Sequence, residues 1–239
     1  MLNDGSEKKL MLITGTSKGI GLSLAQRYLQ EGFRVIGCSR SRATIEHEDY
    51  AHYSLDVSDE EAIIKMVKGI KQQQGVIDVL LNNAGMASMN HLLTTTLSKA
   101  KQVFDSNFFA TFLLTREVAK QMMRKKSGNI INYSTVAVPL NLEGEAIYAA
   151  SKAAIESLTK ISAKELGPLG IRVNAIAPTP VQTDLIKMVP QEKIDNLLES
   201  QVIKRFGTVD DIKNVIDFFI AEKSQFITGQ IIYLGGVMR

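Results

Sequence analysis

Residues 10–21 read Leu-Met-Leu-Ile-Thr-Gly-Thr-Ser-Lys-Gly-Ile-Gly. The apolar run 10–14 predicts a buried β-strand, and the amphipathic stretch 19–31 predicts a helix. Between them, three glycines allow a tight turn and a close approach of the backbone to a ligand. The free N–H groups and the positive dipole end of a helix that starts here favour a pyrophosphate. The segment therefore predicts a dinucleotide-binding turn, although glycine-rich loops also occur without a ligand.

Apolar runs and amphipathic stretches alternate along the rest of the chain. Further strands are expected at 34–38, 52–57, 77–83, 128–135, 171–177 and 230–234, and further helices at 59–73, 98–126, 147–167 and 209–222. Continuous apolar strands that alternate with helices indicate a parallel sheet covered on both faces. We therefore expect an α/β fold: one doubly wound Rossmann-like domain over residues 1–239, with a mostly parallel seven-stranded sheet. The irregular stretch 178–208 leaves room for a small substrate lid around 183–205.

Composition and charge argue against several classes of protein. The net charge of +3 is not gathered into long basic runs, so no nucleic-acid partner is expected. No stretch approaches the roughly 18 apolar residues of a membrane span, so no membrane partner is expected either. A single cysteine and an N-terminus without a signal-peptide layout predict a cytoplasmic protein. The three histidines lack metal-ligand spacing, which predicts that there is no metal site.

Tyr148 and Lys152 lie four residues apart, which places them one turn apart on one face of the helix expected at 147–167. A free phenol has a pKa of about 10, too high for efficient proton transfer near neutral pH. A nearby ammonium and a positively charged nicotinamide ring would both lower that pKa. Tyr148 could then give its proton to a carbonyl oxygen. Alone, such a pair is usually two surface residues, so its position after the fifth strand is what favours a catalytic role.

The spacing Gly15-x-x-x-Gly19-x-Gly21, with Tyr148-x-x-x-Lys152 downstream, resembles the short-chain dehydrogenase/reductase family. The likeness extends from about residue 10 to residue 236, and the pattern is similar to that of the 3-oxoacyl-[acyl-carrier-protein] reductases. It implies an NAD(P)-dependent oxidoreductase whose catalytic residues are Asn107, Thr135, Tyr148 and Lys152. Asn107 would hold a water molecule that resupplies the proton. Thr135 stands where the family has serine, and Ser134 is the alternative hydroxyl.

The resemblance also implies the residues that contact the cofactor. They are Gly15, Ser17, Lys18, Gly19, Ile20, Gly21, Ser39, Arg40, Asp56, Val57, Asn83, Ala84, Gly85, Tyr148, Lys152, Pro178, Val181 and Thr183. At the end of the second strand, NAD enzymes carry an acidic residue that bonds the ribose 2′-hydroxyl, whereas this chain has Ser39 and Arg40. Arg40 and Lys18 can bind a 2′-phosphate that no carboxylate repels. We therefore expect NADP as cofactor, with NADPH preferred over NADH.

The substrate is predicted only as a small-molecule or carrier-bound carbonyl compound, with a 3-oxoacyl thioester favoured by the length of 183–205. A basic patch of Arg124, Lys125, Lys126 and Arg172 would suit an acidic carrier protein, but it also fits a solvated helix end. Candidate pocket residues are Met86, Met89, His91, Leu140, Leu142, Met188 and Val189. Two alternatives stay open: an alcohol or sugar dehydrogenase, and a dinucleotide-binding protein without turnover.

The quaternary structure is a further expectation. The resemblance implies a homo-oligomer, a tetramer or a dimer, paired through the helices at 98–126 and 147–167. The apolar faces of these helices are wide for burial on one sheet alone, which favours the same conclusion.

Overall fold

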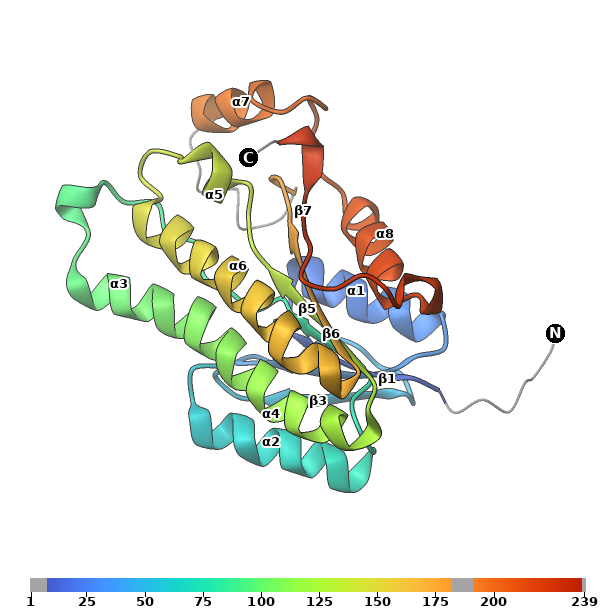
Figure 1. Cartoon of the computed structure of the whole chain (residues 1–239). Coiled ribbons are helices and arrows are strands. Elements are labelled where there is room, and N and C mark those ends of the chain that lie inside the picture. The colour runs from blue at the N-terminus through green and yellow to red at the C-terminus, as the bar shows by residue number, and fades with distance from the viewer. Residues whose placement is uncertain (1–7, 182–190, 238–239) are drawn as a thin grey trace.

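The computed structural model describes residues 8–181 and 191–237. A seven-stranded sheet has the order β3-β2-β1-β4-β5-β6-β7, and every strand pairing in the described part of the chain is parallel (Figure 1). The strands are β1 (Leu10–Thr14), β2 (Arg34–Ser39), β3 (Tyr50–Ser54), β4 (Val79–Asn82), β5 (Gly128–Tyr133), β6 (Ile171–Ala177) and β7 (Ile231–Tyr233). The doubly wound α/β fold is confirmed, with a sheet that is parallel throughout.

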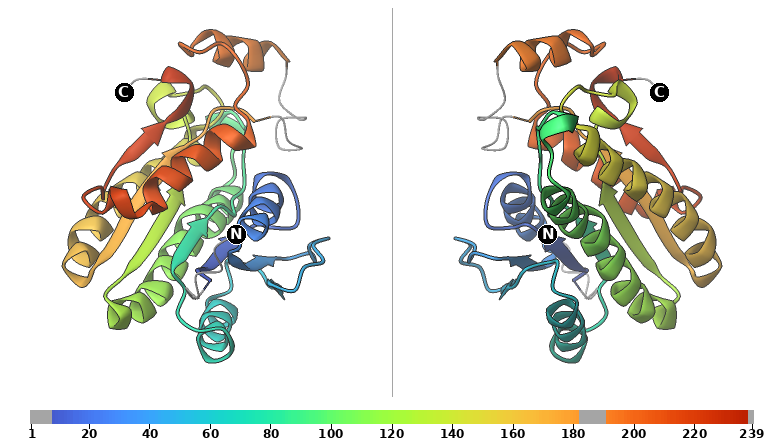
Figure 2. Two further views of the ribbon diagram at one scale, coloured as in Figure 1. Left: turned by 90° about the vertical axis from the view of Figure 1, so that its right-hand side faces the viewer. Right: turned by 90° about the vertical axis from the view of Figure 1, so that its left-hand side faces the viewer.

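Helices cover both faces of the sheet (Figure 2). One face carries α1 (Gly19–Gln30) and α8 (Val209–Ile220), and the other carries α2 (Glu60–Gln73), α4 (Ala110–Lys125) and α6 (Ala146–Leu166). Side chains alternate along β1: Leu12 packs with α2 and α4, whereas Ile13 packs with α1 and α8. Because both faces are buried, the strands are apolar without interruption.

The strand order places a crevice at the carboxyl edge of the sheet. From β1 the chain winds outward through β2 and β3, and then returns to place β4 on the other side of β1. In such sheets, ligands bind outside the carboxyl ends of the strands at the point where the order reverses. The glycine turn after β1 and the end of β4 flank this point, as the sequence predicted.

The long helix predicted over 98–126 is divided in the structure. Here α3 (Leu97–Phe104) runs into a π-helical turn, η2 (Asp105–Phe109), which continues as α4. Such turns occur often at functional sites. Asn107 lies in η2 and is fully buried. From this turn the amide of Asn107 reaches Met86, in the loop after β4, and Ser151 on α6.

Two other expectations on secondary structure are corrected. The third strand was expected at 52–57 but ends at Ser54. The chain turns away because the carboxylate of Asp56 accepts hydrogen bonds from the backbone N–H and the hydroxyl of Ser58, at 2.9 Å and 2.8 Å. The stretch 178–208, expected to be irregular, contains α7 (Gln191–Glu199). The remaining short elements are η1 (Leu92–Thr94), α5 (Ala137–Leu140), η3 (Gly167–Leu169), η5 (Glu222–Ser224) and η6 (Leu234–Gly236).

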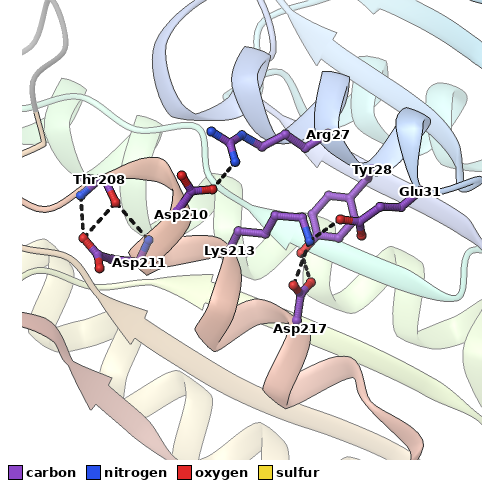
Figure 3. A network of polar contacts seen from close by, with 8 residues as sticks. All are labelled: Arg27, Tyr28, Glu31, Thr208, Asp210, Asp211, Lys213 and Asp217. Carbon is purple, nitrogen blue, oxygen red and sulfur yellow. Dashed lines mark hydrogen bonds and ion pairs between the residues drawn. The ribbon is translucent and has the colours of Figure 1, made fainter.

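A polar network joins α1 to α8 on one side of the sheet (Figure 3). The ammonium of Lys213 lies 2.7 Å from carboxylate oxygens of both Glu31 and Asp217, and 4.8 Å from the centre of the Tyr28 ring. The hydroxyl of Tyr28 donates to Asp217 at 2.9 Å. Because the Lys213 side chain is only 9% exposed, its charge is well shielded and depends on these partners.

Replacing Lys213 by Met is expected to lower the free energy of unfolding by about 1–3 kcal/mol, because two carboxylates lose their partner while the side chain keeps its length. Arg27→Met is the matched control. Arg27 pairs with Asp210 between the same two helices, but both side chains are exposed, so about 0–1 kcal/mol is expected. Urea unfolding of both variants measures the difference. Equal losses would contradict the distinction between shielded and exposed pairs.

The helices also leave apolar side chains on the surface. Phe109, Phe112 and Met123, from η2 and α4, are exposed, as is Ile161 on α6. Within residues 8–181 and 191–237, no helix combines the length and the apolar character that crossing a bilayer requires. The exposed residues lie on the helices for which pairing between protomers is predicted.

Candidate active site

A cavity of about 1000 Å³ lies at the carboxyl edge of the sheet. It brings together most of the predicted site residues: Gly15, Ser17, Lys18, Gly19, Ile20, Ser39, Arg40, Asp56, Val57, Asn83, Ala84, Gly85, Thr135, Tyr148, Lys152, Pro178 and Val181. Gly21 and Asn107 do not line it. Thr183 lies outside the described residues, and so do Met188 and Val189 among the predicted pocket residues.

The glycine turn forms one end of this cavity. Gly15 has φ +76° and its N–H donates to the carbonyl of Cys38 at 2.7 Å, which fastens the turn to β2. A Cβ at Gly21 would lie 2.3 Å from the carbonyl oxygen of Gly15, so no larger residue fits there. Gly21 therefore keeps α1 against the turn instead of touching a ligand. Lys18, the N-cap of α1, makes no side-chain capping bond, and the first helical residues, Gly19 and Ile20, line the cavity.

The end of β4 is fastened to the end of β1. The side-chain amide of Asn83 donates to the carbonyl of Thr14 at 2.8 Å, and the N–H of Ala84 donates to the hydroxyl of Thr14 at 2.8 Å. These bonds fix the two loops that flank the crevice. The predicted motif after the fourth strand thus shapes the cavity wall.

The same end of the cavity is basic where β2, the neighbour of β1, ends. Ser39, Arg40, Ser41 and Arg42 line it, and no carboxylate occupies this stretch. Asp56 lies opposite. Hydrogen bonds from Ser58 lower the pKa of Asp56, and the charge of Arg40 lowers it further. Asp56 is therefore ionised at neutral pH, beside a surface that suits an anion.

Tyr148 lines the cavity from the first turn of α6. Burial raises its pKa to about 12; the charge of Glu145 raises it too, and a hydrogen bond with Thr135 lowers it. The sequence argument expected the ammonium of Lys152 to lower this pKa, but in the structure burial dominates. The phenol is consequently protonated at neutral pH, as a proton donor must be.

Lys152 lies one helical turn further along α6. Its ammonium donates to the carbonyl oxygen of Tyr133 at 2.8 Å, and burial lowers its pKa to about 8. The bond to β5 holds the side chain in the cavity wall. Gly85 lies close by, since a Cβ there would be 3.5 Å from Nζ of Lys152, an ordinary contact distance.

The structure separates the two candidate hydroxyls at the end of β5. The hydroxyl of Ser134 donates to the buried carboxylate of Glu156 at 2.7 Å, and Ser134 is 4% exposed. The hydroxyl of Thr135 instead bonds with Tyr148 and accepts from the N–H of Ala137 at 3.2 Å. The geometry therefore favours Thr135 as the hydroxyl that faces a substrate.

Replacing Thr135 by Val is expected to lower kcat by about 10²-fold, because a hydroxyl that polarises the carbonyl oxygen is lost while the shape is kept. Thr135→Ser should restore most of the rate. Ser134→Ala is the matched control and should leave kcat near that of the unchanged protein. Steady-state kinetics of the three variants measures this, and a larger loss in Ser134→Ala would reverse the assignment.

Asn107 lies behind the cavity. Its side-chain oxygen accepts from the N–H of Met86 at 2.7 Å, and its nitrogen donates to the carbonyl of Met86 and the hydroxyl of Ser151, each at 3.0 Å. A Cβ at Gly85 would lie 3.1 Å from that oxygen, so the amide sits close to Lys152 across Gly85. The role of Asn107 in holding a water molecule stays a prediction.

The cavity also contains residues that the sequence argument missed. Glu145 lies one turn before Tyr148 and Lys193 lies on α7, and both line the wall. Burial raises the pKa of Glu145, and the charge of Lys193 lowers it. The position of Glu145 three residues before Tyr148 was a usable signal. Lys193 could not be placed because α7 was not expected.

The same cavity shows which of the predicted pocket residues lie near the site. Met86, Met89, Leu140 and Leu142 line it, whereas His91 does not. The basic patch lies elsewhere: Lys125 ends α4 and pairs with Asp78, and Arg172 begins β6. Both positions are at the amino edge of the sheet, opposite the cavity. A carrier-docking role would require the patch to border the cavity, and it does not.

A sequence family described as enoyl-(acyl carrier protein) reductase matches residues 15–237. The chain belongs to the short-chain dehydrogenase/reductase family. The resemblance that was drawn from the glycine turn and from Tyr148 and Lys152 is confirmed, and the chain is an oxidoreductase of this family.

Three members of the short-chain dehydrogenase/reductase family show its range. The 3-oxoacyl-[acyl-carrier-protein] reductase of Staphylococcus epidermidis is 34% identical, over 96% of this chain and 98% of that protein. The structure of ElxO with NADP bound has a TM-score of 0.88 and 30% identity, covering 96% of this chain and 98% of that one. NAD⁺-bound xylitol dehydrogenase has a TM-score of 0.87 and 28% identity, covering 95% and 98%. The fold is thus shared by enzymes with different cofactors and substrates.

Proposed function

We propose that this protein uses NADPH to reduce a carbonyl group to an alcohol. One observation carries the proposal: a single cavity holds Thr135, Tyr148 and Lys152 at one end and Lys18 and Arg40 at the other. A dinucleotide needs this arrangement, with cations near its phosphates and a proton donor near its reactive ring.

The residues present fit a nicotinamide dinucleotide. The lack of room for a Cβ at Gly21 keeps the turn compact beside the N-terminus of α1, and Gly85 and Lys152 both line the cavity. Residues 18–20 would hold the pyrophosphate, Arg40 the 2′-phosphate and Lys152 the ribose hydroxyls. When bound, this cofactor supplies the hydride to the carbonyl carbon.

The chain itself supplies the proton. Tyr148, protonated because burial raises its pKa to about 12, donates to the carbonyl oxygen as negative charge develops there. The hydroxyl of Thr135, bonded to Tyr148, helps to fix that oxygen. The ammonium of Lys152 favours the phenolate that remains, because opposite charges attract in a buried site.

For the substrate, we favour a small or carrier-bound 3-oxoacyl thioester. The Staphylococcus epidermidis relative carries that activity in its name, and Met86, Leu140 and Leu142 give the cavity an apolar section. The test follows NADPH oxidation with an acetoacetyl thioester, simple ketones and keto-sugars, and the thioester is expected to have the highest kcat/KM. Failure with every thioester would contradict this substrate. Tight NADPH binding without reduction of any carbonyl would indicate a protein without turnover.

A specific observation favours a second candidate, the reduction of a hydroxylated carbonyl compound such as a keto-sugar. Glu145 places a carboxylate in the cavity wall beside Tyr148, and this carboxylate accepts no hydrogen bond from the described residues. A carboxylate can accept hydrogen bonds from substrate hydroxyls. Xylitol dehydrogenase, whose named substrate is a polyol, shares the fold.

Glu145→Gln distinguishes the two candidates. With a hydroxylated substrate, kcat/KM is expected to fall about 10- to 100-fold, because a hydrogen bond to a charged acceptor contributes about 1.5–3 kcal/mol. The value for a thioester should change much less. Glu143→Gln, a neighbouring change at the same cavity, is the matched control. A proportional loss with both substrates would argue against the second candidate.

The remaining properties are proposals too. We propose one domain with a lid over 183–205, of which residues 183–190 lie outside the described ranges. We also propose a cytoplasmic homo-oligomer, a tetramer or a dimer, that binds neither nucleic acid nor membranes. The exposed Phe109, Phe112 and Ile161 support pairing through η2, α4 and α6. Light scattering that shows a strict monomer would contradict this assembly.

A further inference from the structure

Four polar side chains form a continuous chain of contacts behind the 2′-phosphate end of the cavity. The hydroxyl of Tyr50 lies 3.2 Å from Oγ1 of Thr16 and 2.9 Å from Nδ1 of His52. The other ring nitrogen, Nε2 of His52, lies 3.3 Å from Oγ of Ser39 and 3.1 Å from the carbonyl oxygen of Ser41. The chain therefore connects the glycine turn with the end of β2.

The sheet is built to admit this chain. Gly37 on β2 pairs with His52 on β3, and a Cβ at Gly37 would lie 2.1 Å from the hydroxyl of Tyr50 and 2.4 Å from Oγ1 of Thr16. Any other residue at this position would thus displace the Tyr50–Thr16 contact. Thr16 is fully buried and Ser39 is 8% exposed, so neither is a surface group that bonds by chance.

The partners of the ring accommodate both charge states of His52, with different directions of the hydrogen bonds. The carbonyl oxygen of Ser41 can only accept, so Nε2 must carry a proton. With a second proton on Nδ1, the ring donates to the oxygen of Tyr50, and Tyr50 donates onward to Thr16. A neutral ring can keep these contacts only if Tyr50 turns its proton toward Nδ1 and accepts one from Thr16. The direction of the chain thus depends on the charge of His52.

We propose that His52 belongs to the site for the cofactor 2′-phosphate: it takes up a proton when that phosphate binds, and through Ser39 and Ser41 it positions the residues that contact the phosphate. This inference rests on the proposed use of NADPH. Ser39 and Ser41 line the cavity next to Arg40 and Arg42, and His52 contacts both serines from behind. A positive charge on the ring would therefore add to those of the two arginines.

The surroundings of His52 favour the neutral ring until an anion arrives. Burial lowers its pKa, hydrogen bonding to the backbone of Ser41 and Ser39 raises it, and the charge of Arg42 lowers it. The groups that face His52 are Tyr50, from the same strand, and Ser39, from β2. The charged group that acts on His52 is Arg42, in the loop after β2. In the described part of the chain no carboxylate acts on the ring. A phosphate dianion beside Arg42 would supply the missing negative charge and raise the pKa of His52.

The sign of the pH dependence follows. Because the phosphate raises the pKa of His52, the affinity that the charged ring adds for the 2′-phosphate is fully present below the pKa of His52 in the free protein. It is lost as the pH rises through the pKa of the complex. The phosphate itself, with a second pKa of about 6, releases protons when cations bind it. Net proton uptake can therefore come only from a group on the protein.

The test uses 2′,5′-ADP and 5′-AMP as probes, because their binding needs no carbonyl substrate and no turnover. Titration calorimetry in buffers of different ionisation enthalpy gives the number of protons taken up on binding. The unchanged protein is expected to take up protons with 2′,5′-ADP but not with 5′-AMP. His52→Gln should abolish this uptake and weaken 2′,5′-ADP binding about tenfold near pH 6, with a smaller loss at alkaline pH. His47→Gln, an exposed histidine of the same region, is the matched control.

Tyr50→Phe tests the chain without removing the imidazole. It takes away the acceptor of Nδ1–H, so proton uptake is expected to fall and its midpoint to move to lower pH. The inference is overturned if Tyr50→Phe and His52→Gln take up as many protons as the unchanged protein. In that case a preference for 2′,5′-ADP over 5′-AMP would still support the proposed use of NADPH. Equal affinity of the unchanged protein for 2′,5′-ADP and 5′-AMP would overturn both. If His52→Gln does not fold, proton uptake by Tyr50→Phe with the same amount and midpoint as in the unchanged protein is enough to overturn the inference.

Discussion

Tyr148→Phe is expected to lower turnover by about 10²- to 10⁴-fold, the usual contribution of a general acid. The ring keeps its place on α6, but the proton for the carbonyl oxygen is gone. NADPH binding should be unchanged, because the residues proposed to hold the pyrophosphate and the 2′-phosphate lie at the far end of the cavity. Steady-state kinetics measures the turnover. The affinity for NADPH is measured from the change in fluorescence when NADPH is titrated with the protein.

Tyr53→Phe is the control for the loss of a tyrosine hydroxyl, since Tyr53 lies on β3 and does not line the cavity. It should keep the turnover of the unchanged protein. If Tyr148→Phe retained most of its activity, Tyr148 could not be the proton donor. If it lost NADPH binding as well, the substitution would have damaged the cavity and the kinetic loss would not report on proton transfer.

Arg40→Asp is expected to reduce the preference for NADPH over NADH by about 100-fold. Loss of a charged hydrogen bond to the 2′-phosphate costs about 1.5–3 kcal/mol, and each 1.4 kcal/mol is a factor of ten. The new carboxylate adds repulsion toward the phosphate and can accept a hydrogen bond from the 2′-hydroxyl of NADH. The ratio of kcat/KM for the two cofactors measures the effect.

Arg124→Asp changes the charge of the protein by the same amount at the end of α4 and is the matched control. It should leave the cofactor ratio as it is. An unaltered ratio in Arg40→Asp would show that Arg40 does not meet the 2′-phosphate. Parallel shifts in both variants would point to net charge as the cause.

Local patterns in the sequence sufficed for the framework and for part of the site. The run before Gly15 and the turn after it indicated both the first strand and the helix N-terminus, because these signals are local in the chain. The spacing of Tyr148 and Lys152 placed both on one face of α6, and the structure puts both in the cavity wall. The sequence likewise showed that no acidic residue stands at the end of the second strand, where Ser39 and Arg40 are found.

Features that depend on contacts distant in sequence could not be predicted. The choice between Ser134 and Thr135 depends on the carboxylate of Glu156, which binds the first hydroxyl. The contact of Tyr50 with Thr16 depends on the register of β2 against β3, which no periodicity reveals. The raised pKa of Tyr148 could not be predicted either, because the extent of burial cannot be derived from sequence.

The π-helical turn η2 has a consequence for how such a site can arise. A π turn accommodates one residue more than the α-helix it interrupts, so the helices on either side can keep their axes with or without it. Loss of one codon between Asp105 and Phe109 would restore an unbroken helix and withdraw the inward-facing amide. A single-residue insertion in an ancestral helix is thus enough to create this part of the site, and a single deletion is enough to erase it.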